Sequence, residues 1–425
     1  MRIRQLLALL ALAAATGIQA QSASPPSTPP LTLAQVMAAA RDNVEVALAR
    51  SNVDAARADI RAADHAPLPL LSAKAASIDL QNGVGGGNLL RDKRIDKSLG
   101  IDWTWERGDK RALRTLAAQR TADAVAADFD DTRLQQQLAA LGAYFDLLAA
   151  QERIGELEAI ERSAAQLAAT AQRRVKAGDL AAQDANRSEI EARRVRLDVD
   201  TAQLDRERAA LALASLIGSA APNVLRVAAL WPATAARADV PDFGALIDRR
   251  SDVRAVEARV QAAQAAREGA LALKRSDITW GTSFDHFPGS STRQLELRLQ
   301  MPLQWGYEQQ GEIARAEAQL AQARDAAVRA RLLAANELQR LQREAQALAA
   351  RAQAHADDIV PRARRAAEQA ELAYSKGALP LTDLLDARRT LRSTLLDALA
   401  ARTDHAKADG AWRLRTQDDA PVRPQ

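Results

Sequence analysis

Apolar residues recur at helical spacing over most of this chain. The clearest stretch runs from about residue 109 to 175 and contains no proline. Its large apolar residues step by three and four positions, at Leu134, Leu138, Leu141, Phe145 and Leu148. This heptad spacing predicts a long helix that packs as a coiled coil. Further alanine-rich segments of helical character lie at about 31–66, 183–215, 251–273, 309–375 and from there to about 410.

Two pairs of short segments alternate apolar and polar residues instead, which is the spacing of strands. Segment 98–106 places a leucine, an isoleucine and two tryptophans on one side. Segment 293–305 has an apolar residue at every second position from Leu295 to Trp305. With a weaker strand at 70–80 and a further strand at 276–284, they predict the strand pairs 70–106 and 276–305.

The order of these elements occurs twice: helix, strand pair, long helix, sharp turn, helix. This self-similarity predicts a tandem duplication of one structural unit. The expected divisions are a signal peptide at 1–20, a disordered tail at 21–30, a first repeat at 31–215, a linker at 216–245, a second repeat at 246–410 and a C-terminal tail at 411–425.

The same pattern, G-x-L-x-x-x-D, interrupts both long helical runs. It begins at Gly178 and again at Gly377. Glycine readily adopts the positive φ that closes a helix, so each glycine is expected to form the turn of a long helical hairpin. Pro361 lies inside the second long run and is expected to kink or loosen it.

Composition and charge exclude several classes of function. Residues 1–20 combine two arginines, a short apolar run and small residues near Ala20, as a secretory signal peptide does. The net charge of +4 arises from 58 basic and 54 acidic residues that are intermixed, which argues against nucleic-acid binding. No cysteine is present, and the four histidines, His65, His286, His355 and His405, show no ligand spacing. We therefore expect no metal, no cofactor and no catalytic residues, and no enzyme motif is found.

The predicted strands determine the architecture. An exported chain can bury an apolar strand face in a sheet sandwich or in lipid, and lipid requires a closed barrel without free edges. The smallest membrane barrels use about eight strands, so four strands cannot close alone. Several copies must share one barrel. A soluble helical rod with a small sheet is the alternative.

The order and spacing of these features resemble the TolC family of outer-membrane efflux channels, over nearly all of the mature chain. The segments that carry the resemblance are "GDKR" at 108–111 and "IVPRARRAAEQAELAYSKGALPLTDLLDARRTL" at 359–391. The "GDKRALR" element is similar to the cobalt-zinc-cadmium branch. The resemblance implies a mainly α fold with a membrane portion, in which a homotrimer forms a 12-stranded β-barrel continued by a 12-helix α-barrel.

The resemblance also implies partners and a location. The barrel would lie in outer-membrane lipid of a Gram-negative bacterium, and the helices would extend into the periplasm. The helical tips would dock onto a periplasmic adaptor that serves an inner-membrane pump of the RND type. The exported substrate would be divalent heavy-metal cations or drugs.

Site residues are carried over from the family position by position. Asp383 and Asp386 would form stacked acidic rings at a periplasmic gate, where they attract cations. Tyr374 and Asp184 would latch the closed gate, although the basic latch position of the family is Leu379 here, followed by Pro380. The adaptor-docking tips would be Gly178, Leu180, Gly377 and Leu379. The membrane girdle follows from the strand pattern itself, because tryptophans lie near the ends of the alternating segments: Trp103, Trp105, Trp280 and Trp305.

Two alternatives remain from the sequence. The chain could be the outer component of a type I protein secretion system, since pump and adaptor choose the substrate. A protein of another class, a periplasmic adaptor or coiled-coil scaffold, would usually carry one hairpin rather than two.

Overall fold

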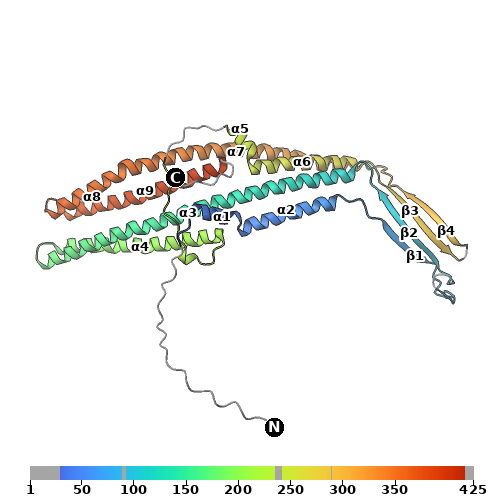
Figure 1. The fold of residues 1–425 in the computed structure, drawn as a ribbon, viewed down its shortest axis with the longest axis horizontal. Coiled ribbons are helices and arrows are strands. Elements are labelled where there is room, and N and C mark those ends of the chain that lie inside the picture. Colours follow the sequence, from blue (N-terminus) through green and yellow to red (C-terminus); the bar gives the residue numbers. More distant parts are fainter. Residues whose placement is uncertain (1–28, 89–91, 235–241, 289, 417–425) are drawn as a thin grey trace, which may run out of the picture.

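The computed structural model describes residues 29–88, 92–234, 242–288 and 290–416. The predicted signal peptide at 1–20 lies outside the described residues, as do most of the predicted tail at 21–30 and residues 417–425 of the predicted C-terminal tail. The molecule is long and narrow, with a sheet at one end and the turns of two helical hairpins at the other (Figure 1).

The first repeat begins with two helices, α1 (Leu33–Arg41) and α2 (Val44–Ala63). The prediction of one continuous helix over 31–66 was wrong, because Asn43 interrupts it. The Asn43 side chain accepts a hydrogen bond from the backbone N–H of Val46 at 3.0 Å and so caps α2.

The long run predicted at 109–175 is a single helix, α3 (Lys110–Lys176), followed by α4 (Ala182–Ile217). At about 1.5 Å per residue, α3 is about 100 Å long. The predicted seam residues Leu141, Phe145 and Leu148 are buried, and Tyr144 and Leu147 join them in the main core cluster. Many of the other buried residues on the helices are alanines, whose small side chains let neighbouring helices approach closely.

The linker contains a 3-10 turn, η1 (Pro222–Val224), and a parallel bridge between Leu31 and Val227. The second repeat contains α5 (Phe243–Arg249), α6 (Ser251–Ala272), α7 (Gln310–Ala354), a π-helical turn η2 (His355–Ile359), α8 (Val360–Ser375) and α9 (Leu381–Thr416). The π turn ends two residues before Pro361, the residue expected to loosen this run. Helix α9 continues to Thr416, beyond the predicted end near 410.

The described residues contain one four-stranded antiparallel sheet, in the order β1 (Leu70–Ala76), β2 (Asp96–Trp105), β3 (Ile278–Phe287), β4 (Ser291–Gln300). The central contact between β2 and β3 joins the two repeats. The predicted extension of β4 to Trp305 was wrong: the strand ends at Gln300, just before Pro302, which lacks the N–H that a ladder needs.

Both long helices that follow the sheet begin in the same unusual way. The residue before α3, Asp109, has φ 57°, and the residue before α7, Gln309, has φ 61°. Left-handed conformations are uncommon for residues other than glycine. Their presence at equivalent positions of the two repeats supports the duplication that the sequence predicts.

A buried ion network holds the middle of the molecule together. Arg250, at the start of α6, contacts Glu337 of α7 at 2.6 Å and Asp252 at 2.8 Å. Burial acts to lower the pKa of Arg250, but its hydrogen bonds to these two carboxylates outweigh burial and raise it. Arg415 of α9 reaches Glu337 at 3.3 Å and Asp131 of α3 at 3.5 Å. The network therefore connects α3, α6, α7 and α9.

None of the helices within the described ranges combines the length and the apolar character needed to cross a membrane.

Candidate functional site

One face of the sheet is apolar and exposed in the protomer. Cross-strand register places its residues together, because paired residues of antiparallel strands share a face. We call this surface the apolar sheet face; it comprises Leu71, Leu99, Ile101, Trp103, Trp105, Trp280, Phe284, Leu295, Leu297 and Leu299. A contiguous apolar surface of this kind requires a partner or lipid.

The opposite face of the sheet is polar. Arg298 of β4 donates a hydrogen bond to Asp102 of β2 at 2.8 Å, across Gly281 of the intervening strand β3. Ser283 and Asp285 are buried on this face and bond to each other at 3.1 Å. The sheet thus has a mainly apolar and a mainly polar side, as the alternating sequence predicts, with Leu70 on the polar side and Thr282 on the apolar side as exceptions.

The four predicted girdle tryptophans lie toward the helical end of the sheet. Trp103 of β2 pairs directly with Trp280 of β3, and Trp105 is the last residue of β2. Trp305 follows the end of β4 and is 87 % exposed. Their assignment to a membrane interface stays a prediction, but the structure places them where the apolar sheet face ends.

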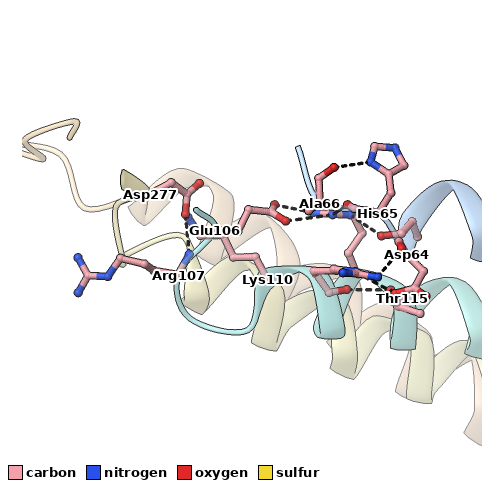
Figure 2. A network of polar contacts seen from close by, with 11 residues as sticks. Asp64, His65, Ala66, Glu106, Arg107, Lys110, Thr115 and Asp277 are labelled. Carbon is pink, nitrogen blue, oxygen red and sulfur yellow. Dashed lines mark hydrogen bonds and ion pairs between the residues drawn. The ribbon is translucent and has the colours of Figure 1, made fainter. Parts of the chain in front are cut away.

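A polar junction connects the sheet to the helices (Figure 2). Arg114 of α3 holds Glu106 at 2.9 Å and also donates to the backbone oxygen of His65 at 2.9 Å. Lys110 contacts Asp277, which precedes β3, at 2.7 Å. The "GDKR" element therefore fixes the direction in which α3 leaves the sheet.

At the far end of the hairpins, both predicted glycines have positive φ, 80° for Gly178 and 73° for Gly377. Each completes a Schellman motif. The N–H of Asp179 donates to the oxygen of Arg174 at 2.8 Å, and the N–H of Ala378 donates to that of Ala373 at 2.9 Å. Leu180 and Leu379 follow these turns and are partly exposed. Docking by these tips stays a prediction.

The predicted gate residues are spread around the second turn. Tyr374 packs against the buried cluster Leu381, Leu384 and Leu385. Asp383 and Asp386 are exposed on the first turns of α9, and Asp386 lies 3.5 Å from Arg389.

Asp184 is held elsewhere within the protomer. Its closest ion pair is to Arg187, at 3.9 Å. Among the described residues of one protomer, no hydrogen bond joins Asp184 to Tyr374. The latch was proposed between neighbouring coils, so it remains a prediction.

Sequence reasoning missed the contact that connects the two hairpins. Glu191 of α4 is only 7 % exposed and accepts hydrogen bonds from Arg389 of α9 at 2.7 and 3.0 Å. Arg392 lies 3.6 Å from the same carboxylate. The hydrogen bond to Glu191 is the main reason that the pKa of Arg389 is raised. The cluster of arginines at 388, 389 and 392 was the available signal, but nothing in the sequence identified their acidic partner.

A second missed feature is an exposed apolar stripe on α4. Ile190, Leu197, Leu204 and Leu211 recur every seven residues, and each is more than half exposed. Below, these residues are called the α4 stripe. A heptad seam that is open to solvent in the protomer is typical of a coiled coil whose partner helix belongs to another chain.

In the described ranges, no group of three or more histidine, aspartate or glutamate side chains is arranged to hold a metal ion.

Comparisons with known proteins agree with this geometry. The profile of the family described as outer membrane efflux protein matches residues 36–219. The cobalt-zinc-cadmium resistance protein CzcC of Cupriavidus metallidurans is 25% identical over 290 residues, which cover 67% of this chain and 68% of that protein.

Solved structures share this fold over most of the chain. A membrane protein from Pseudomonas aeruginosa superposes with a TM-score of 0.76 at 19% identity, covering 90% of this chain and 93% of that one. The outer membrane protein VceC of Vibrio cholerae gives a TM-score of 0.74 at 18% identity, with 90% and 95% covered. These likenesses show the fold, and the family profile identifies residues 36–219 as similar to the outer membrane efflux proteins, which supports a place in the outer membrane with the helices in the periplasm.

Proposed function

We propose that this chain is the outer-membrane channel of a tripartite efflux system, and that three copies form one continuous exit duct. The observation that carries the proposal is the sheet with one exposed apolar face and one polar face. Within the part of the chain that the structure describes, β1 and β4 each pair on one side only. Lipid tolerates no unpaired strand edges, so the edges of neighbouring copies must meet.

Closure by three copies gives twelve strands, four from each copy as described, which lies in the range of bacterial membrane barrels. The polar sheet face would then line the pore, and the apolar sheet face would contact lipid. The α4 stripe supports the same assembly, because its leucines need a helix from a neighbouring copy. The helices α3, α4, α7, α8 and α9 would continue the barrel as a helical tube.

The tips and the gate complete the proposal. The two glycine turns, with Leu180 and Leu379, dock onto a periplasmic adaptor that links the channel to an inner-membrane pump. Asp383 and Asp386 form acidic rings that favour cations near the periplasmic opening. No bond is made or broken in the channel, and the pump supplies the energy.

The proposed substrates are divalent heavy-metal cations. The support is the similarity to a cobalt-zinc-cadmium resistance protein over two thirds of the chain. The exposed carboxylates of Asp383 and Asp386 suit weak, transient contact with such ions.

The experiment has two parts. The mature chain, purified in detergent, is expected to run as a trimer by light scattering and to give discrete conductance steps in a planar bilayer. Cells that lack the chain are expected to lose resistance to zinc, cobalt or cadmium and to regain it with the intact chain. A monomer without conductance would refute the proposed channel. If the protein is a conducting trimer but cells that lack it keep their metal resistance, only the proposed substrate is refuted.

A further inference from the structure

An open cavity of about 520 Å³ lies at the junction between the sheet and α3. This volume is in the range of small-molecule sites. Four basic side chains line it, Arg107, Lys110, Arg111 and Arg275, against two acidic ones, Glu106 and Asp109. The cavity therefore favours an anion.

Half of these six charged side chains already have partners. Lys110 contacts Asp277 at 2.7 Å, Arg111 contacts Asp64 at 3.0 Å, and Glu106 is held by Arg114. These pairs form the rim of the cavity and hold its shape. Because each charge is neutralised by its partner, the pairs contribute little to the attraction of an anion.

Two guanidinium groups remain. Within the described residues, no carboxylate or carbonyl oxygen is bonded to the side chain of Arg107 or of Arg275. The contact of the Arg107 guanidinium is the sulfur of Met301, at 4.0 Å. In Figure 2 this guanidinium points away from Asp277 and Lys110. The Arg275 side chain lies against Gly108, where a Cβ atom would come within 2.9 Å of its Cδ.

The position of the cavity distinguishes these arginines from ordinary surface charges. Trp105, an exposed residue at the end of the apolar sheet face, also lines the cavity. Arg107 follows Trp105 by two residues, which continues the outward side of β2. Tryptophan next to arginine at the end of an apolar surface is typical of the headgroup level of a membrane, where phosphate groups lie.

We propose that Arg107 and Arg275 bind the phosphate of a membrane phospholipid, whose acyl chains lie along the apolar sheet face. Each guanidinium donates charge-assisted hydrogen bonds to phosphate oxygens, in a geometry for which arginine is well suited. Asp109 opposes this binding, because its carboxylate lines the same cavity. The inference rests on the membrane placement in the proposed function.

The test measures lipid retention. The intact protein is purified in a mild detergent, incubated with phosphatidylglycerol, and analysed by native mass spectrometry. The variant Arg107→Gln/Arg275→Gln is expected to bind the lipid about tenfold or more weakly, as the loss of charge-assisted hydrogen bonds predicts. Arg293→Gln, which removes an exposed cation at the opposite end of the sheet, is the matched control and should retain lipid like the natural protein.

A third variant tests the sign of the charge effect. Asp109→Asn keeps a residue that tolerates the left-handed backbone at this position, and it should increase lipid retention. Equal retention by the natural protein and the double arginine variant would overturn the proposal. Displacement of the lipid by inorganic phosphate, with chloride of the same ionic strength having no effect, would identify a site for free anions and also overturn it.

Conductance separates this inference from the proposed function. If the natural protein forms pores but the double variant retains as much lipid, only the lipid site is wrong. If the natural protein forms no pores, the membrane placement itself fails.

Discussion

Replacement of Leu204 by glutamate should weaken the trimer without unfolding the protomer. Leu204 is 54 % exposed in the protomer, in the centre of the α4 stripe. Complete burial of a leucine side chain contributes about 1.5–3 kcal/mol, so covering the exposed half contributes about 1 kcal/mol. A closed trimer has three equivalent interfaces, so the variant loses about 3 kcal/mol per trimer, or about a hundredfold in the dissociation equilibrium. The cost of bringing a carboxylate into the seam adds to this loss.

The measurement is the concentration at which the detergent-solubilised protein dissociates, followed by light scattering or native mass spectrometry. Gln203→Glu is the control, because it introduces the same charge on the neighbouring exposed position of α4, outside the stripe. Circular dichroism should show the same helix content for all three proteins. If the Leu204 variant dissociates at the same concentration as the natural protein, the α4 stripe is not an interface and the argument from exposed leucines is wrong.

Four further variants test the tips, the gate and the helical body. Gly178→Val forces a β-branched residue to φ 80° and should abolish efflux while the trimer persists; continued efflux would argue against docking by this tip. Tyr374→Phe should raise the closed-state conductance in a planar bilayer, and an unchanged value would exclude the latch. Glu191→Gln should weaken the contact between the hairpins by about 1–2 kcal/mol, since Arg389 is partly exposed, and should speed hydrogen exchange in α9 near Arg389; unaltered exchange would contradict it. Burial lowers the pKa of His405, with a smaller opposing effect of Asp409, so its stabilising contribution is present above about pH 6.5 and is lost as the pH falls. The melting temperature of the natural protein should therefore fall more steeply than that of His405→Leu between about pH 7.5 and 5.5; parallel curves would refute this.

Much of the fold follows from local patterns in the sequence. The alternation around Trp103 predicted a strand, and the heptad spacing around Leu141 predicted a helix. Both predictions are confirmed, because in each element one side is apolar. The errors arose where one residue changes the backbone. Asn43 offers its side chain to an N–H group and starts a new helix, and Pro302 removes the donor that would have continued β4.

The candidate site was predictable only where a backbone requirement determines the residue. Gly178 and Gly377 were predicted because a left-handed helix end strongly favours glycine. Glu191 was not, because its importance depends on arginines almost 200 residues away that only the packed hairpins bring together. The same holds for Arg275, which lines the same cavity as Arg107 because β2 pairs with β3.

In the described part of the protomer, two surfaces lack partners, the strand edges of the sheet and the α4 stripe. They differ in chemistry, but both are explained by the same proposed assembly. The edges of β1 and β4 need hydrogen-bond partners, which another copy can supply and lipid cannot. The α4 stripe needs apolar contacts in water, which lipid cannot supply if these helices lie in the periplasm. Neither surface could be satisfied by the membrane alone, so the proposed assembly assigns a neighbouring copy to both. Because the long helix α3 runs from the sheet to the helical tip, one arrangement of copies can satisfy the strand edges at one end and the stripe at the other. Assembly of this kind would add to the stability of a protomer that is already folded, so the melting temperature should rise with protein concentration.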